Sequence, residues 1–240
     1  MRMSDHRSDC PWRSRSRRAS LVLVAWAFVM LVGGCSTSES HRVVETPTVE
    51  SYTTDYSGPK YGLSIGSFNN NSPYLRGIFS DGEDRLGNQA KTILKTHLSQ
   101  TNRFDLLDRE NLSAIRQESE LSGQDLDLQG AELVVTGQVT EFGRNTTGDK
   151  QLFGILGRGK QQTAYSKVSV NIVDVKTSKI VYSVQGAGEY SLSDREVVGF
   201  GSSSGYDSTL NGKVLNLAIT DAVNKLVRAL EAGEWGPVTR

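Results

Sequence analysis

Few residues in this chain have the types and spacing that chemistry requires. The 240 residues include two cysteines and three histidines. His97 stands between leucines on a predicted helix, a common place for a histidine at the edge of a core. Asp125 and Asp127 lack EF-hand spacing, and no cluster of cysteine and histidine offers a zinc-like ligand set. The sequence therefore predicts no enzyme, no metal and no cofactor, and the reactive group that matters is the thiol of Cys35.

Cys35 stands at the end of a predicted secretory signal. Four arginines between residues 13 and 18 precede an apolar run over residues 21–32. A helix that crosses a bilayer needs about 20 apolar residues, so this shorter run predicts a cleaved signal over residues 1–34. Residues 31–35, with the sequence LVGGC, resemble the lipobox of bacterial lipoproteins. In those proteins the cysteine thiol is diacylated and becomes the new amino terminus, which makes Cys35 the expected lipidation site.

Lipidation predicts where the mature chain resides. Two or three acyl chains exceed the marginal membrane binding of a single chain, so the protein should stay attached to a membrane. Ser36 follows the cysteine, whereas the sorting rule of enteric bacteria reserves the inner membrane for lipoproteins with aspartate there. The expected location is the periplasmic face of the outer membrane.

Charge and cysteine content limit the partners of the mature chain. The sequence has 27 basic and 27 acidic residues, and removal of a signal with six arginines and two aspartates leaves 21 against 25, a net charge of −4. No basic stripe predicts binding to nucleic acid. Because Cys10 leaves with the signal and Cys35 is acylated, we expect no disulfide. About 200 residues suffice for one core.

A tether should join the lipid to this domain. Residues 36–60 are rich in Ser, Thr, Glu and Pro and show no apolar period, which predicts a flexible tether over 35–60. The domain is expected over 61–235, followed by a short tail over 236–240.

Apolar periodicity predicts strands and helices in alternation. Strands are expected over 61–68, 103–107, 131–142, 168–172 and 180–185. A helix with a capping box at Ser80 and Glu83 should reach Gln100, and a second, capped by Asp108, should turn Leu112 and Ile115 inward. The last helix carries an apolar stripe from residue 214 to 230, with Gly233 at its end. This order favours an α/β fold with helices packed on one mixed sheet.

Two inserts do not fit that simple fold. Residues 143–166 and 186–211 are rich in Gly, Ser and Thr, and each is longer than the structureless loops of compact domains.

A family resemblance accounts for these inserts. The lipobox, the order of elements and four segments carry it: FGILG at 153–157, VSVNIVDV at 168–175, TSKI at 177–180 and ITDAV at 219–223. Together they resemble the CsgG/HfaB family. Its members include the curli secretion channel, an outer-membrane lipoprotein that assembles into a ring. Each protomer of that channel contributes two β-hairpins to a shared transmembrane barrel and one loop to a narrow constriction.

The resemblance implies that the two inserts are membrane hairpins. Alternation places apolar side chains on one face of each, namely Phe153 and Ile155 in the first and Val198 and Phe200 in the second. Asp194 and Glu196 fall on the same face as Val198 and Phe200, where lipid would not favour them. The alternative is that both inserts are exposed or partner-binding loops.

The resemblance also implies a constriction loop after the first strand. Tyr74 and Phe79 stand where the curli channel has its tyrosine and phenylalanine, and Ile78 takes the place of an asparagine. The alternative is a small cluster in which Tyr74 and Phe79 pack beneath the loop.

Two functions follow as expectations. The first is an oligomeric outer-membrane lipoprotein that forms a passive channel, without nucleotide or metal, for export of surface fibre or adhesin subunits. The second is a periplasmic adaptor lipoprotein that keeps the same domain and binds or activates envelope proteins. The expected partners are a membrane through the lipid, further copies of the chain, and secreted subunits or envelope proteins.

Overall fold

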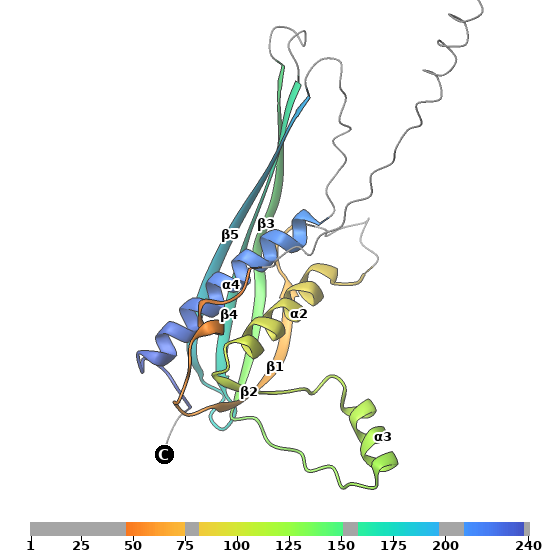
Figure 1. Ribbon diagram of the computed structural model, residues 1–240, viewed down its shortest axis with the longest axis vertical. Coiled ribbons are helices and arrows are strands. Elements are labelled where there is room, and N and C mark those ends of the chain that lie inside the picture. The colour runs from red at the N-terminus through yellow and green to blue at the C-terminus, as the bar shows by residue number, and fades with distance from the viewer. Residues whose placement is uncertain (1–46, 75–81, 151–157, 197–208, 238–240) are drawn as a thin grey trace, which may run out of the picture. The chain divides into compact units, whose positions relative to one another are not determined.

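The computed structural model describes residues 47–74, 82–150, 158–196 and 209–237. They form a 3-10 helix η2 (Glu50–Thr53), the strands β1 (Tyr61–Asn70), β2 (Phe104–Leu107), β3 (Leu133–Lys150), β4 (Arg158–Asp174) and β5 (Ile180–Glu196), and the helices α2 (Arg85–Gln100), α3 (Leu112–Ser122) and α4 (Leu210–Glu231). The predicted α/β class with one mixed sheet is confirmed (Figure 1).

The five strands form one sheet in the order β2-β1-β3-β4-β5. β1 runs parallel to both β2 and β3, whereas β4 is antiparallel to β3 and to β5. The turn at residues 175–179 joins β4 to β5 as a hairpin. β2 and β5 are therefore the two edges of the sheet.

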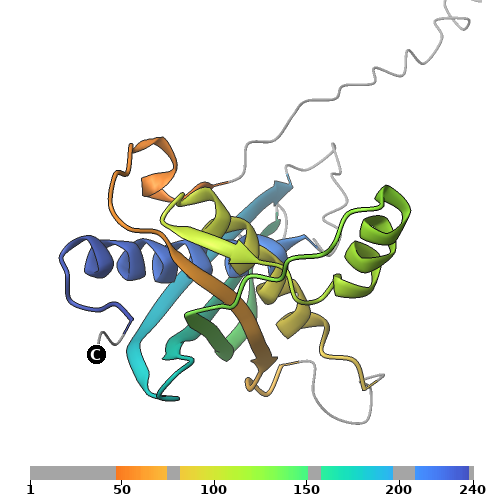
Figure 2. The ribbon, with the colours of Figure 1, turned by 90° about the horizontal axis from the view of Figure 1, so that it is seen from below.

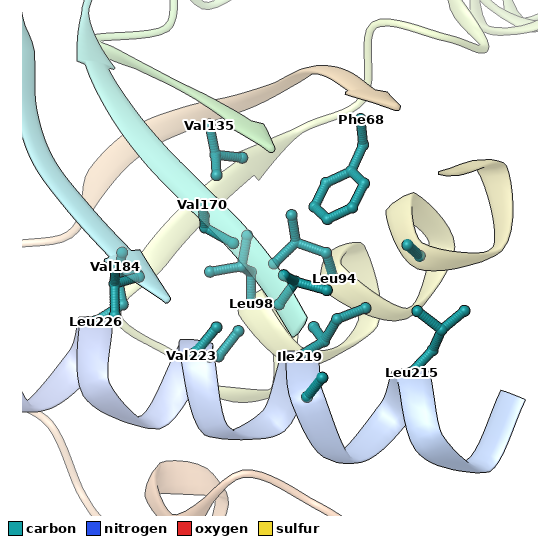
Figure 3. Close-up of a cluster of buried hydrophobic side chains, with 14 of the residues drawn as sticks. Phe68, Leu94, Leu98, Val135, Val170, Val184, Leu215, Ile219, Val223 and Leu226 are labelled. Atoms are coloured by element: carbon teal, nitrogen blue, oxygen red, sulfur yellow. The ribbon is translucent and has the colours of Figure 1, made fainter. Parts of the chain in front are cut away.

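α2 and α4 cover one face of this sheet (Figures 1 and 2). Side chains alternate along β4, so that Val168 and Ile172 are buried against the helices while Lys167 on the other face is exposed. The apolar stripe of α4 packs into the same core, where Ile219 and Val223 are at most 1% exposed (Figure 3). The predicted stripe of the last helix is confirmed.

The strands β3, β4 and β5 are longer than the sequence predicts. The β3–β4 ladder continues without a break from the Phe142↔Ser166 pair to Lys150↔Arg158, and β5 pairs with β4 as far as Glu196. Of the described parts of both inserts, residues 143–150, 158–166 and 186–196 are therefore strand, and residues 209–211 lead into α4. The prediction ended the strands early because apolar alternation stops at Phe142, although backbone pairing does not require it.

The N-terminal boundary of the domain also lies earlier than expected. Val49 is 2% exposed and belongs to the core, and the backbone N–H of Glu50 donates to Oδ1 of Asn224 at 3.0 Å. The expected tether over 35–60 therefore includes residues that pack on the domain. One buried valine in a polar stretch gives no periodic signal, which is why the sequence did not reveal it.

The two helix starts differ from the predicted caps. α2 begins at Arg85 after Asp84, whose carboxylate accepts from the Gly87 N–H at 2.8 Å. α3 begins at Leu112 after Asn111, whereas the predicted cap Asp108 accepts from the N–H of Glu110 before the helix. Asp84 caps α2 with its side chain, whereas Asn111 makes no side-chain cap bond and donates instead to the carboxylate of Asp108.

α3 does not face inward. None of its residues is buried, and Ile115, which the pattern turned toward the core, is 36% exposed. Its apolar spacing is helical, but the chain around it leads the helix away from the sheet (Figure 1).

Candidate functional site

We call the extended part of β3, β4 and β5, over residues 143–150, 158–166 and 186–196, the ribbon. In Figure 1 these strands continue past the helices. The residues at its base, Tyr74, Phe142, Arg144, Gln162 and Asn211, we call the neck. They come from the loop after β1, from two strands and from α4. This convergence makes the neck the strongest candidate site.

Asp84 holds together the two ends of the loop that starts after β1. One carboxylate oxygen accepts from the N–H of Asn70 at 2.7 Å, and the other accepts from the N–H of Gly87. The side-chain amide of Asn70 in turn donates to the carbonyl of Tyr74 at 2.8 Å. These bonds link the end of β1 to the start of α2, so the loop between them starts and ends at fixed points.

Tyr74 packs against β3 just before the first insert. Its half-buried ring packs on Phe142, with ring centroids 4.5 Å apart, and the side-chain amide of Asn211 donates to its hydroxyl at 3.5 Å. Phe142 is 4% exposed. The loop after β1 is thereby attached to β3 at the residue before the ribbon begins.

Arg144 joins the remaining elements of the neck. Its Nη1 donates to Oδ1 of Asn211 at 3.3 Å, and its Nη2 donates to Oε1 of Gln162 at 3.1 Å. Gln162 is 4% exposed although it is polar. The hydrogen bond from Arg144 offsets part of the free-energy cost of burying its side-chain amide. The guanidinium thus connects β3, β4 and the first turn of α4.

The ribbon at and just beyond the neck carries hydrogen-bonding side chains on both faces. On the open face, the amide of Gln161 donates to the hydroxyl of Ser191 at 3.0 Å, and Thr163 shares a 2.7 Å hydrogen bond with the same hydroxyl. On the covered face lie Arg144 and Gln162. Side chains of this kind suit water, since lipid-facing positions of membrane strands are apolar.

The structure describes only one of the site residues predicted from the sequence. Tyr74 is in the neck. The others, Cys35, Ile78, Phe79, Phe153, Ile155, Val198 and Phe200, lie outside the described residues. Sequence reasoning missed Arg144, Gln162 and Asn211, because isolated polar residues in a Gly/Ser-rich insert carry no pattern. The one feature of the sequence that could have indicated them is their position, since each lies near an end of an insert.

A second cluster surrounds a buried arginine. Arg103 is 2% exposed; it donates to Glu231 and to the carbonyls of Ser51, Thr54 and Thr101. Its guanidinium carbon lies 4.8 Å from the centre of the Tyr56 ring, and burial raises the pKa of that tyrosine hydroxyl. The hydrogen bonds that the Arg103 guanidinium donates therefore go to acceptors of the same chain. The cluster therefore fastens residues 51–56 to the domain.

In the described part of the chain, no group of three or more His, Cys, Asp or Glu residues is arranged to hold a metal ion. No helix among these residues has the length and apolarity needed to cross a bilayer.

The fold and the neck define an α/β domain whose three long strands extend into a ribbon. Its sequence is 61% identical over 219 residues to NMB1126/NMB1164 of Neisseria meningitidis serogroup B, which is described as a candidate lipoprotein; the match covers 91% of this chain and 97% of that protein.

Two solved structures of bacterial proteins match the chain at low sequence identity. The PelC dodecamer from Paraburkholderia phytofirmans is 16% identical, with a TM-score of 0.34, and covers 71% of this chain and 93% of its own. Lipoprotein GNA1162 from Neisseria meningitidis is 15% identical, with a TM-score of 0.30, and covers 71% and 99%.

The family model described as curli production assembly/transport component CsgG matches residues 53–238. The chain belongs to the CsgG family. The resemblance inferred from the lipobox, the inserts and the last helix is confirmed at the level of the family.

Proposed function

We propose that this protein is an outer-membrane lipoprotein, acylated at Cys35, whose copies assemble into a passive channel for secreted surface subunits. The observation that carries the proposal is the neck. Tyr74, the first residue of the predicted constriction, packs on Phe142 at the base of the ribbon. A loop fixed there would lie at the entrance of any passage that the ribbons of several copies enclose.

The ribbon supports a role at a membrane through its length. Past Phe142, β3 extends eight residues to Lys150 and β4 pairs with it throughout. A membrane strand needs about 9 to 11 residues, a length that these eight residues reach only together with the apolar segment around Phe153 and Ile155 that follows them in the sequence. In this arrangement the polar base of the ribbon stands in the periplasm, and the part beyond it enters the bilayer.

The polar base favours a second candidate function. Because both faces near the neck carry hydrogen-bonding side chains such as Arg144 and Gln161, the ribbon suits a partner protein as well as a channel wall. An adaptor would bind envelope proteins with the ribbon and would use the lipid only as an anchor. The two functions differ in whether the ribbon tip touches lipid.

The deciding experiment is the particle mass and shape of the full-length lipidated protein in mild detergent, followed by conductance in planar bilayers. A closed ring with a conducting pore supports the channel. Val198→Asp with Phe200→Asp should abolish conductance, whereas Val197→Asp, on the opposite face by alternation, should retain it. A monomer or dimer, or unchanged conductance in the double variant, would overturn the channel in favour of the adaptor.

The anchor is tested separately. Cys35→Ala should release the protein from the membrane fraction into the periplasm if the lipid is the only attachment. A channel held by its own strands would remain in the membrane. Radiolabelled palmitate should label the unaltered chain and not the variant; equal labelling would rule out Cys35 as the acylated residue.

A further inference from the structure

We call residues 108–132, which connect β2 to β3 and include α3, the excursion. It is fixed at its base and uncovered along its length. Lys95 forms a 2.9 Å ion pair with Asp108, and Lys91 pairs with Glu110, which ties the start of the excursion to α2. Arg109 donates to the carbonyl of Gln129 and so joins its two ends. Yet no residue of α3 is buried. The helix is held in place but has no packing partner within the described chain.

An 11-residue helix of this kind is unusual. Isolated helices shorter than about 12 to 15 residues are marginal in water, and most helices in proteins depend on burial of an apolar face. Here Ile115, Leu121 and Leu128 are 36%, 74% and 45% exposed. These side chains would gain stability from a surface that covers them, which a single copy does not provide.

The excursion is also acidic. Residues 116–128 carry Glu118, Glu120, Asp125 and Asp127 against one arginine. Among the described residues, none of these four carboxylates takes part in an ion pair. A partner for this surface should therefore combine apolar side chains with positive charge.

The turn between β4 and β5 has that combination. Over residues 175–180, VKTSKI, it contains two lysines and no acid. Val175 is 47% exposed and Ile180 is 60% exposed. Within the part of the chain that the structure describes, neither Lys176 nor Lys179 forms an ion pair. Exposed apolar side chains flanked by lysines complement the exposed apolar side chains flanked by carboxylates.

The two surfaces lie at one end of the sheet but on opposite sides. The excursion returns into Leu133, and Leu133 pairs with Asp174, the residue before the turn. However, α3 follows the edge strand β2, whereas the turn starts the other edge strand, β5. In Figures 1 and 2, α3 stands to the right and the β4–β5 turn lies well to its left. One copy cannot bring its own two surfaces together.

We propose that α3 of one copy docks on the β4–β5 turn of the next, with Glu118 and Glu120 facing Lys176 and Lys179. Two different patches at opposite edges form a head-to-tail contact, and such contacts close into rings when the rotation between copies allows it. The inference deepens the proposed function, because it names the contact through which the copies would assemble. It does not require that the assembly cross a membrane.

Cysteine trapping in the full-length lipidated protein tests the contact directly. Once the signal is removed and Cys35 is acylated, the chain has no other thiol. Co-expressed chains bearing Leu121→Cys and Thr177→Cys should form a disulfide-linked dimer, and a chain bearing both should form a ladder of covalent multimers. The matched control pairs Leu121→Cys with Ser191→Cys, an exposed residue of β5 near the neck, and should give no cross-link.

Charge exchange tests the complementarity. Glu118→Lys with Glu120→Lys should reduce the cross-link about tenfold, as should Lys176→Glu with Lys179→Glu, since like charges then face each other across the contact. Mixing the two variant chains, or combining all four changes in one chain, should restore it. Restoration excludes misfolding as the cause of the loss. Raising the salt concentration should weaken the contact in the unaltered chain.

The outcomes separate this contact from the channel. A ring without the cross-link overturns the inference and leaves the channel standing. The cross-link in a non-conducting assembly supports the inference and counts against the channel. A monomer without the cross-link, or a cross-link only to another envelope protein, overturns the inference. Loss of the cross-link in both charge variants without restoration on mixing would also overturn it.

Discussion

The ring of Tyr74 packs on the ring of Phe142 with centroids 4.5 Å apart, which couples the loop after β1 to the strand that begins the ribbon. Phe142 is nearly fully buried, and the ladder beyond it runs to Lys150. The loop and the ribbon therefore meet at this aromatic pair. The pair is the structural reason to treat the loop and the ribbon as one site.

Phe142→Ala should destabilise the domain and loosen the loop. Replacing a buried phenylalanine by alanine typically costs about 3 to 5 kcal/mol of unfolding free energy, because the ring loses its contacts and leaves a cavity. Urea unfolding followed by circular dichroism measures the loss. Tyr74→Phe keeps the ring and removes the hydroxyl that accepts the long hydrogen bond from Asn211, so it should cost less than about 1 kcal/mol. An equal loss in both variants would contradict the role assigned to ring packing.

Arg103→Ala should release residues 51–56 from the domain. Breaking a fully buried ion pair costs about 3 to 5 kcal/mol; because the Glu231 side chain is 40% exposed, we expect about 2 kcal/mol. Limited proteolysis should show faster cleavage near residue 56. The control is Arg228→Ala, which removes an exposed pair with Glu50 and should change stability by less than about 0.5 kcal/mol. Unaltered proteolysis in the Arg103 variant would show that the segment is held by other contacts.

The sequence correctly predicts those strands and helices in which apolar residues recur with a regular period. Val168, Val170 and Ile172 define β4, and the stripe through Ile219 defines α4, because burial of one face leaves a period that the sequence displays. The same reasoning failed for α3. Its leucine and isoleucine have helical spacing, but spacing does not say whether another element is present to cover them.

The candidate site is less predictable from sequence than the core. Tyr74 was identified through a family resemblance, and nothing local to it indicates contact with Phe142, which lies 68 positions later in the chain. Arg144 and Asn211 meet only because β3 and α4 are brought together by the sheet. Such long-range polar contacts depend on the tertiary fold and leave no periodic trace.

Gly186→Ala should disrupt the packing of α4 on β5. A Cβ atom at Gly186 would lie 2.1 Å from the carbonyl oxygen of Ala218, a backbone atom that cannot move without shifting the helix. Overpacking of this kind costs about 1 to 3 kcal/mol or more, measurable as a lower melting temperature. Gly130→Ala is the matched control, since nothing lies within 4 Å of a Cβ there; it should be neutral or stabilise by up to about 1 kcal/mol. Similar effects at both positions would contradict the close helix–strand contact.

Asp108 should make the base of the α3 excursion sensitive to acid. The hydrogen bond from Lys95, with that from Asn111, holds the pKa of the Asp108 carboxyl well below its usual range. A carboxyl with a lowered pKa in the folded state stabilises the protein above the ordinary aspartate pKa of about 3.9. That stabilisation is lost as the pH falls from there toward the folded-state pKa.

Asp108→Asn should therefore lower the unfolding free energy at neutral pH by about 1 kcal/mol or less, because the Lys95 pair is partly exposed and such pairs are weak. The difference between the unaltered chain and the variant should shrink as the pH falls below about 4, as urea unfolding at pH 7 and pH 3 would measure. Lys95→Met removes the same pair from the other side and should show the same convergence. A difference that stayed constant over this range would mean that Asp108 acts as a neutral hydrogen-bond acceptor and that its charge contributes nothing.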